Sequence, residues 1–256
     1  MAHPKQATIQ NKLLSLLPET TFDLVAPSLE AVVLPLKTVL ATRGEPIEHV
    51  YFLTSGLGSV IVETAEGHRA EAGLFGFDGH IPTSAAADVE LAPHEISMQL
   101  PGEGYRMSYS AFAALMDSDR GFSKVMIRCM EAFTIQLSYT AASNSIHDIN
   151  ERLARWLLMC HDRVQGNEIG LTHDAMAVML AVRRPSVTTA LHVLEGLGFI
   201  RSTRGRITIR DRAALEEFAQ DAYGRPEAEY RRLMKGLPKS LDEALTPDGR
   251  TKGPFG

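Results

Sequence analysis

The first 109 residues alternate short apolar runs with turn-forming residues. Five apolar runs have the length of strands and lie at residues 32–36, 50–53, 59–63, 71–74 and 95–100. Gly and Pro gather between them, as in Arg43-Gly44-Glu45-Pro46 and in the turn predicted at residues 101–104. Two short amphipathic helices, near residues 11–17 and 22–27, precede the runs. Closely spaced short strands are typical of a small antiparallel barrel or sandwich.

From Ser110 the pattern becomes helical. Residues 110–146 contain one Gly and no Pro, which predicts one long helix. One apolar face of this helix contains Phe122, Met126, Cys129, Phe133 and Leu137. Other apolar residues lie on the remaining sides, so the helix needs more than one partner. We expect it to pack on the strand-rich region and on a second copy of itself; burial within one larger domain is the alternative.

Residues 172–196 predict two short helices joined by a tight turn. Thr172 is a suitable N-cap, and Pro185 suits the start of the second helix. Only residues 181–184 separate the helices, which indicates a helix-turn-helix. The second helix leaves short polar side chains and one forked cation on its outer side, where such a helix meets base edges. The predicted base-reading residues are Arg184, Ser186, Thr188 and Thr189.

A β-hairpin with a basic tip follows directly. Residues 199–210 change to a period of two, and Arg204 and Arg206 flank the turn residue Gly205. Arginines in this position suit DNA phosphates. The predicted phosphate contacts are Thr172, Arg183, His192, Arg204 and Arg206. A winged module used only for protein contacts is the alternative.

The charge distribution agrees with this division. The chain has a formal net charge of −5, yet seven arginines and only two acidic residues fall within residues 181–212. A compact basic stretch behind an acidic first half indicates that one part touches a polyanion. A solvated basic face without a partner would have the same charges.

Composition excludes several classes of protein. The chain of 256 residues is 45% hydrophobic and has two cysteines, so it is neither disordered nor framed by disulfides. It has no apolar run long enough for a bilayer and no signal-peptide pattern, which favours a cytoplasmic protein without a membrane partner. Because no P-loop, nucleophile elbow or zinc-protease motif occurs, an enzyme is not expected.

The order of these regions resembles the Crp/Fnr (catabolite activator / fumarate–nitrate regulator) family of transcription regulators. The strings Gly44-Glu-Pro-Ile47, Val50-Tyr-Phe-Leu53 and Leu180-Ala-Val-Arg-Arg-Pro-Ser-Val-Thr188 carry the resemblance. It implies an α+β fold: an N-terminal double-stranded β-helix (a jelly-roll-like β-roll), a long central dimerisation helix and a C-terminal winged helix-turn-helix. It also implies a homodimer on a palindromic promoter site in double-stranded DNA, with RNA polymerase and a small-molecule effector as further partners.

The implied division is a roll over 1–109, the dimer helix over 110–146, the winged domain over 147–215 and a C-terminal extension over 216–256 that is partly disordered. Within the roll, Gly73, Phe75, Gly76, Thr83 and Ser84 are the expected effector pocket. Arg184 matches the arginine that the family uses to read guanine. Pro185 and Thr189 depart from the best-known members, so the operator should differ. Ala181 replaces a common turn glycine.

The sensing chemistry stays open. Members that bind cyclic nucleotides have an arginine in their phosphate segment, but none occurs between Arg69 and Arg106, so cyclic AMP is disfavoured. The N-terminus lacks the cysteines of an iron–sulfur cluster. Haem is disfavoured although four roll histidines are available, and no zinc-ligand spacing occurs. The hypothesis is therefore a homodimeric, sequence-specific DNA-binding regulator with an unidentified signal. A cyclic-nucleotide-binding-like interaction module without sequence-specific DNA binding is the alternative.

Overall fold

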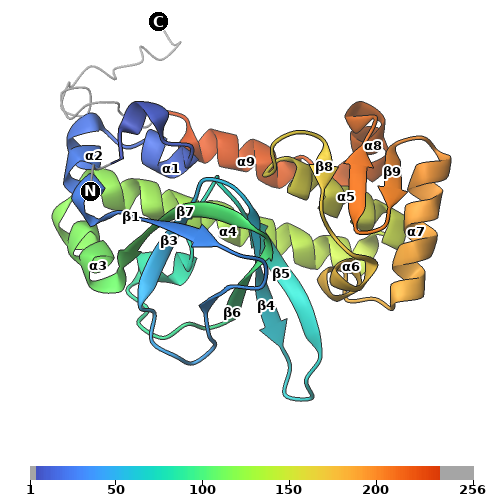
Figure 1. Cartoon of the computed structure of the whole chain (residues 1–256), viewed down its shortest axis with the longest axis horizontal. Coiled ribbons are helices and arrows are strands. Elements are labelled where there is room, and N and C mark those ends of the chain that lie inside the picture. The colour runs from blue at the N-terminus through green and yellow to red at the C-terminus, as the bar shows by residue number, and fades with distance from the viewer. Residues whose placement is uncertain (1–3, 237–256) are drawn as a thin grey trace, which may run out of the picture.

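The computed structural model describes residues 4–236. A strand-rich roll lies below one long helix, α4, which runs across the molecule to a winged domain at its other end (Figure 1). None of the helices in the described part is both long enough and apolar enough to span a membrane. The stretch 246–256, expected to be disordered, lies outside the described residues.

Short helices close the N-terminal side of the roll. A 3₁₀ turn at Gln6–Thr8 is followed by α1 (Lys12–Ser15) and α2 (Glu19–Val25). The buried side chain of Asn11 caps α1 by accepting from Leu13 and Leu14. Its amide also donates to the Leu53 and Gly79 carbonyls, at 2.9 and 3.0 Å. These bonds attach the predicted N-terminal helices to two separate points of the roll.

The roll consists of two antiparallel sheets. One has the order β1-β7-β3 and the other β2-β6-β4-β5. The strands are β1 (Glu30–Leu34), β2 (Val39–Ala41), β3 (His49–Leu53), β4 (Leu57–Glu63), β5 (Arg69–Phe75), β6 (Glu95–Leu100) and β7 (Gly102–Ser108). Side chains from both sheets fill the space between them, with Phe75, Ile81 and Met98 at most 3% exposed. A 3₁₀ helix at Thr83–Ala87 connects β5 towards β6.

The turn predicted at residues 101–104 is wrong, because β7 begins at Gly102. Sheet register places Gly104 opposite Leu53 and Val32. A Cβ atom on Gly102 would lie 2.2 Å from the Ser55 carbonyl oxygen, and one on Gly104 would lie 2.6 Å from that of Phe52. The glycines therefore permit close backbone approach within a strand instead of forming a turn. The short strand β2 was also not predicted.

The range 110–146 forms two helices instead of one. They are α3 (Tyr109–Ser118) and α4 (Arg120–Ile146). Asp119 separates them in an extended conformation and accepts the Phe122 N–H at 2.7 Å, so it caps α4. The hydroxyl of Thr21 donates to the same carboxylate at 3.1 Å. An N-cap aspartate stops α3 and restarts the chain in a new direction.

The winged domain is built on three helices and a small sheet. Its elements are α5 (Ile149–His161), β8 (Glu168–Ile169), α6 (His173–Met179), α7 (Arg184–Gly196), β9 (Ile200–Thr203) and β10 (Arg206–Ile209). Asp148 and Glu151 form a capping box on α5. The predicted buried face of α7, at residues 187, 190, 191 and 194, is fully buried. The sheet order is β8-β10-β9, so the hairpin gains a third strand.

The chain continues through α8 (Arg212–Ala219), a 3₁₀ turn at Gln220–Ala222 and α9 (Arg225–Met234). Helix α9 returns along α4 and lies above it in Figure 1. Arg128 on α4 donates to the Leu233 carbonyl at 2.8 Å, and Met234 is buried in the core shared by α4 and the N-terminal helices. Residues 225–234 are therefore an ordered part of the fold.

The predicted dimer face of α4 is covered by the same chain. Phe122 and Met126 are fully buried and Cys129 is 4% exposed, because they pack on the N-terminal helices and α3. Phe133 and Leu137 are half-buried, and Phe133 packs on the roll core. Phe122, Met126 and Cys129 therefore serve the interior of the subunit, and the prediction that these three form the helix-pairing surface is wrong. For the half-buried Phe133 and Leu137 it stays a prediction. The free face of α4 is a different one.

Candidate nucleic-acid interface

The turn between α6 and α7 is closed by backbone hydrogen bonds. The Thr172 hydroxyl accepts the Ala175 N–H and caps α6, as predicted. At the other end of α6, Ala181 and Val182 donate to the Val178 and Ala177 carbonyls, at 3.1 and 3.0 Å. This ending places Ala181 at φ 51°, in the left-handed region. The turn therefore has the backbone that favours glycine, although the chain has alanine there.

Replacing Ala181 with glycine is expected to stabilise the protein by about 0.5–1 kcal/mol. The left-handed conformation costs an alanine about 1–2 kcal/mol, and the greater freedom of glycine in the unfolded chain offsets part of the gain. Chemical denaturation measures the difference. The control Ala177→Gly, inside α6, should instead destabilise by about 0.5–1 kcal/mol. Equal changes in the free energy of unfolding for the two substitutions would contradict a left-handed backbone that favours glycine at position 181.

The N-terminal end of α7 presents an exposed polar surface. Arg183, Arg184, Ser186, Thr189 and His192 are all exposed. Arg184 is the first residue of α7, and its Nε lies 3.4 Å from a carboxylate oxygen of Asp174 on α6. Both side chains are at least 64% exposed. Such a pair contributes little to stability. The guanidinium is thus held near the turn by a partner that DNA could replace.

Thr188 does not share this surface. Its hydroxyl donates to the Arg184 carbonyl at 3.2 Å and lies 3.0 Å from Nδ1 of His173 on α6. Its side chain therefore links the two helices. Of the four predicted base-reading residues, three lie together on the free surface and Thr188 lies at the junction of α6 and α7.

The hairpin forms the second part of the surface. Thr203 pairs with Arg206, so Arg204 and Gly205 form a two-residue loop, with Gly205 at φ 74°. Arg204 and Arg206 are exposed, and Arg206 forms an ion pair of 3.1 Å with Glu168 on β8. These cations reach solvent at the tip, as expected for phosphate contacts.

The expected effector residues do not form one pocket. A Cβ atom on Gly73 would lie 2.8–2.9 Å from Leu137, Gln136 and Phe133 of α4, and one on Gly76 would lie 2.8 Å from the Arg163 side chain. Phe75 and Thr83 line a cavity of about 550 Å³, whereas Gly73, Gly76 and Ser84 do not. Gly73 and Gly76 therefore have no room for a side chain, because α4 packs directly on Gly73 and Arg163 on Gly76.

A cation from another part of the chain packs on the expected effector segment, residues 73–84, which contains no arginine of its own. Arg163, at the end of α5, is 7% exposed and forms an ion pair of 2.8 Å with Asp78. Its stem covers Gly76, and it donates to the Met159 carbonyl at 2.8 Å. Burial by itself would lower the pKa of Arg163, but the nearby carboxylates of Asp78 and Asp162 outweigh it, so the pKa is raised above its ordinary value. The roll segment is thus tied to the first helix of the winged domain.

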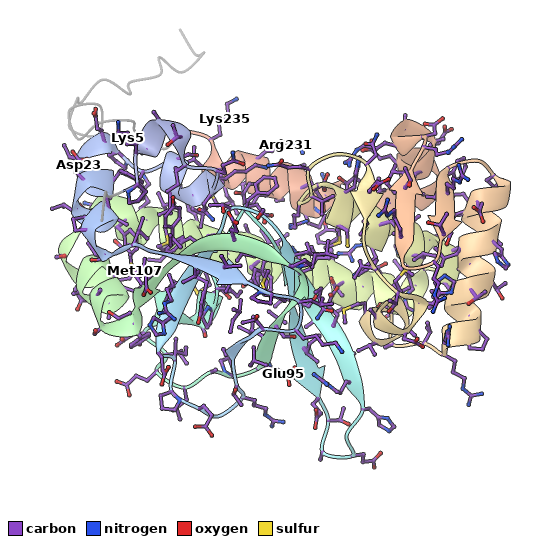
Figure 2. All side chains as sticks on the ribbon, viewed as in Figure 1. Lys5, Asp23, Glu95, Met107, Arg231 and Lys235 are labelled. Atoms are coloured by element: carbon purple, nitrogen blue, oxygen red, sulfur yellow. The ribbon has the colours of Figure 1, made fainter. Side chains whose placement is uncertain are left out.

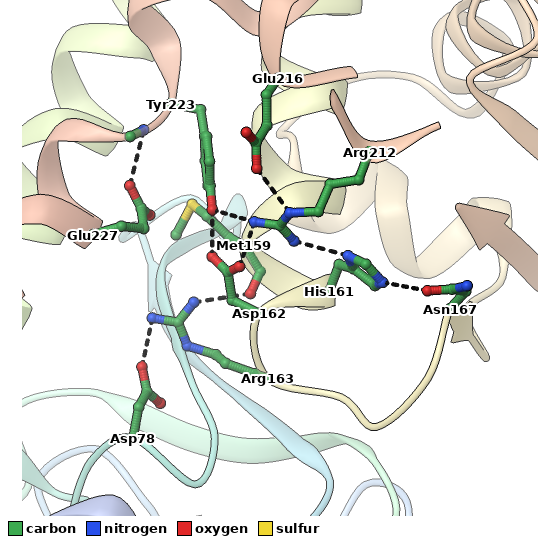
Figure 3. Close-up of polar contacts among 11 residues, drawn as sticks. Asp78, Met159, His161, Asp162, Arg163, Asn167, Arg212, Glu216, Tyr223 and Glu227 are labelled. Atoms are coloured by element: carbon green, nitrogen blue, oxygen red, sulfur yellow. Dashed lines mark hydrogen bonds and ion pairs between the residues drawn. The ribbon is translucent and has the colours of Figure 1, made fainter. Parts of the chain in front are cut away.

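A cluster centred on Arg212 joins α5, α8 and the chain before α9 (Figure 3). The guanidinium donates to Asp162 and to the Tyr223 hydroxyl, each at 2.7 Å, and to Nδ1 of His161 at 2.8 Å. It also pairs with Glu216 at 2.7 Å. Burial and Asp162 raise the pKa of Tyr223. Arg212, which the sequence includes in a basic stretch, therefore has a structural role.

A buried carboxyl connects the roll to the winged domain. Glu71 on β5 is 7% exposed and accepts the indole N–H of Trp156 on α5 at 2.7 Å. The Ser59 hydroxyl on β4 donates to the same carboxyl and also lies 3.7 Å from the Met179 sulfur on α6. Burial raises the pKa of Glu71 to about 7. The sequence did not indicate Glu71, since its only signal is an acidic residue at the apolar end of a strand.

Within residues 4–236 there is no group of three or more His, Cys, Asp or Glu side chains that could hold a metal ion. His80 is 1% exposed and lies 5.4 Å from the Phe112 ring centroid. Burial lowers its pKa to about 4, so the ring is neutral at pH 7. Cys129 and Cys160 are buried free cysteines.

The fold and the exposed surface together define a protein with a helix-turn-helix and a basic wing attached to a roll. Residues 151–218 match the family model of the Crp-like helix-turn-helix domain. Among curated proteins, none matches the chain.

Solved structures share the architecture. FixK2 from Bradyrhizobium japonicum aligns with a TM-score of 0.66 at 14% identity, over 75% of this chain and 98% of that one. TTHB099, a Crp-family transcriptional regulator from Thermus thermophilus, has a TM-score of 0.60 at 20% identity, over 74% and 96%. The c-di-GMP-responsive regulator CLP from Xanthomonas campestris has a TM-score of 0.58 at 16% identity, over 74% and 98%. Residues 151–218 therefore form a Crp-like helix-turn-helix domain, and the chain shares the fold of solved Crp/Fnr regulators.

Proposed function

We propose that the protein is a cytoplasmic transcription regulator that acts as a homodimer on a two-fold symmetric site in double-stranded DNA and responds to a signal other than cyclic AMP. The observation that carries the proposal is the exposed N-terminal end of α7 beside the exposed arginines of the hairpin. Arg184 reads a base and the hairpin arginines contact phosphates. RNA polymerase is a further partner by family resemblance.

The filled interior of the roll supports the exclusion of cyclic AMP. Phe75 occupies the space beside Gly58, where a Cβ atom would lie 2.3 Å from its ring. Arg163, which packs on Gly76 of the segment, is paired with Asp78. A phosphodiester inside the roll would have to displace buried side chains, and the Arg163 charge is already neutralised.

Selection from random oligonucleotides, with and without cyclic AMP, tests the DNA proposal directly. We expect a two-fold symmetric motif without the nucleotide. A motif that requires cyclic AMP would overturn the exclusion. Absence of any motif in both selections would favour the interaction module without sequence-specific DNA binding.

Arg184 and Arg204 should affect DNA binding differently. We expect Arg184→Ala to weaken binding to the selected site by about 1–3 kcal/mol and to relax the preference at one base pair. Arg204→Ala should weaken all sequences about equally and reduce the salt dependence, because a phosphate contact carries no sequence information. Fluorescence anisotropy on cognate and scrambled duplexes over a range of salt measures both. Identical behaviour of the two variants on every duplex would show that Arg184 does not read a base.

The free face of α4 supports the homodimer. Exposed residues recur at alternating steps of four and three, at Ile127, Glu131, Thr134, Ser138, Ala141 and Ser145. The hydroxyls of Thr134, Ser138 and Ser145 donate to carbonyls four residues earlier, each at 3.0 Å. Their polarity is therefore satisfied within the helix. From Thr134 to Ser145 the repeat consists of small side chains, which allow two helices to approach closely.

Ala141→Glu is expected to shift the protein to monomers, with a dissociation constant at least about 30-fold higher. Two-fold symmetry brings the new carboxylates close together, and like charges in an interface are unfavourable by several kcal/mol. Analytical ultracentrifugation measures the change. Ala114→Glu, an exposed site on α3, is the control and should remain dimeric. An unchanged dimer dissociation constant for Ala141→Glu would mean that the interface lies elsewhere.

A further inference from the structure

Resting on the DNA-binding role proposed above, we propose that residues 220–234 form a strap that positions the winged domain for DNA. The strap consists of the 3₁₀ turn at Gln220–Ala222, α9 and the two residues between them. It follows the Crp-like helix-turn-helix domain, whose match ends at residue 218. In the proposed dimer, each strap fixes its own winged domain and thereby the separation of the two α7 helices. A signal that loosens the strap would lower the affinity for DNA.

The chain passes from the long helix to the winged domain through a break. Helix α4 ends at Ile146, and His147 and Asp148 are extended, with ψ of 148° and 171°, before α5 begins at Ile149. A few residues of this kind between two helices are a usual hinge, because rotation about their backbone moves everything that follows. Apolar contacts between the roll and α5 oppose separation but are not directional, so hydrogen bonds that cross the hinge are what fix the angle.

The strap begins with a contact to this hinge. The His147 side chain is only 10% exposed, and its Nε2 lies 3.1 Å from a carboxylate oxygen of Asp221. Its Nδ1 lies 3.1 Å from the Ser143 hydroxyl on α4. One ring thus connects the end of α4 with the beginning of the strap. Tyr223, a little further along the strap, donates to Asp162 at 2.7 Å, which attaches the strap to the end of α5 beyond the hinge.

The strap ends on the roll side of the hinge. Tyr230 donates to the Asp78 carbonyl at 2.7 Å, which attaches α9 to the roll. Met234 is 7% exposed and packs in the core formed by α4 and the N-terminal helices. Lys235, the next residue, is labelled beside these helices in Figure 2. The strap therefore crosses the hinge and is bound on both sides of it.

The strap leaves the DNA-binding surface free. Helix α9 runs along α4, whereas α7 and β9 lie at the opposite end of the molecule from the N-terminal helices where the strap ends (Figure 1). Arg184, Arg204 and Arg206 are exposed with the strap in place. The strap therefore does not cover the surface that meets DNA. Holding such a surface in position before the partner arrives raises the affinity, because less freedom is lost on binding.

Binding of full-length variants to a whole site and to half of it tests the strap. Met234→Asp introduces a charge at the buried end of the strap and should detach it. We expect this variant to bind the selected two-fold site at least about tenfold more weakly, because the two winged domains of the dimer no longer have a fixed separation. Binding to a duplex that contains half of the site should change less than about twofold, since one winged domain is sufficient there. Fluorescence anisotropy measures both dissociation constants.

Ala228→Asp is the matched control, because it introduces the same side chain at an exposed position of α9. It should bind both duplexes like the wild type, and so should the conservative variant Met234→Leu. Tyr230→Phe loses only the hydroxyl that donates to Asp78, so it tests the strap even if Met234→Asp unfolds. It should weaken binding to the whole site about two- to fivefold. Equal losses on the two duplexes, or unchanged or tighter binding to the whole site, would overturn the proposal.

Hydrogen exchange without DNA separates this inference from the function on which it rests. Release of the strap in Met234→Asp should speed exchange of the amides at residues 147–151 at least about tenfold, while the amides of α7 exchange as in the wild type. No change at residues 147–151 would overturn the strap. Faster exchange in both places would mean that the winged domain is not held at a separate hinge, which also overturns it. A wild type that binds neither duplex would overturn the DNA-binding role, whereas the exchange experiment would still decide whether the strap holds the hinge.

Discussion

Replacing Arg163 with methionine is expected to destabilise the protein by about 3–5 kcal/mol. The substitution keeps an apolar stem over Gly76 but leaves Asp78 largely buried without its cation, and Asp78 is only 14% exposed. Breaking one partner of a buried pair has an effect of this size, because the remaining charge stays desolvated. Urea denaturation at pH 7 measures the loss.

The double variant Asp78→Asn/Arg163→Met separates the charge from the packing. It removes both charges together, so it should be distinctly more stable than Arg163→Met alone. The introduced amide retains an oxygen that can accept the Gly76 N–H, which Asp78 accepts at 3.0 Å. A double variant as unstable as the sum of the single ones would mean that the two residues do not interact.

Glu71→Gln should make the protein more stable above pH 7 and leave it nearly unchanged near pH 4.5. Burial raises the pKa of Glu71 from 4.5 to about 7, so the folded state holds a proton that the unfolded state has released. Wild-type stability therefore falls as pH rises from about 4.5 to about 7. At about 1.36 kcal/mol for each pH unit, the fall from this group is about 3 kcal/mol.

Glutamine imitates the protonated carboxyl. Its oxygen can accept from Trp156 and its amide can donate to Ser59, so the variant keeps both contacts without the charge. Denaturation at pH 5 and pH 8 compares variant and wild type. Glu45→Gln, at an exposed turn, is the control and should show no such pH dependence. An equal difference between Glu71→Gln and wild type at both pH values would contradict a buried ionisable Glu71.

Glu71 also shows how the roll and the winged domain form one core. Leu57, Ile61, Leu74 and Leu100 of the roll belong to the same cluster as the buried residues of α5, α6 and α7. A change of charge at Glu71 acts directly on this junction, because Trp156 lies on α5 and Met179 on α6. The pH experiment therefore also tests how much this junction contributes to the stability of the chain.

The sequence by itself determined the DNA-binding part. Residues 187, 190, 191 and 194 predicted one face of α7, and Arg204-Gly205 predicted the hairpin turn. These features depend on neighbours within one helix or one hairpin, so the local spacing of apolar and turn residues is sufficient. The same applies to most strands of the roll. The prediction from local spacing was wrong at Gly102 and Gly104, which have the pattern of a turn but permit close contact between strands.

Only the tertiary structure decided which faces and charges meet. The spacing of α4 showed apolar residues on several sides but could not show that the chain itself covers Phe122, Met126 and Cys129. Likewise, the roll segment contains no arginine of its own, and its cation, Arg163, lies 85 residues further along the chain from Asp78. Pairing over such separations depends on how the domains and α9 pack together, and a local pattern contains no information about that packing.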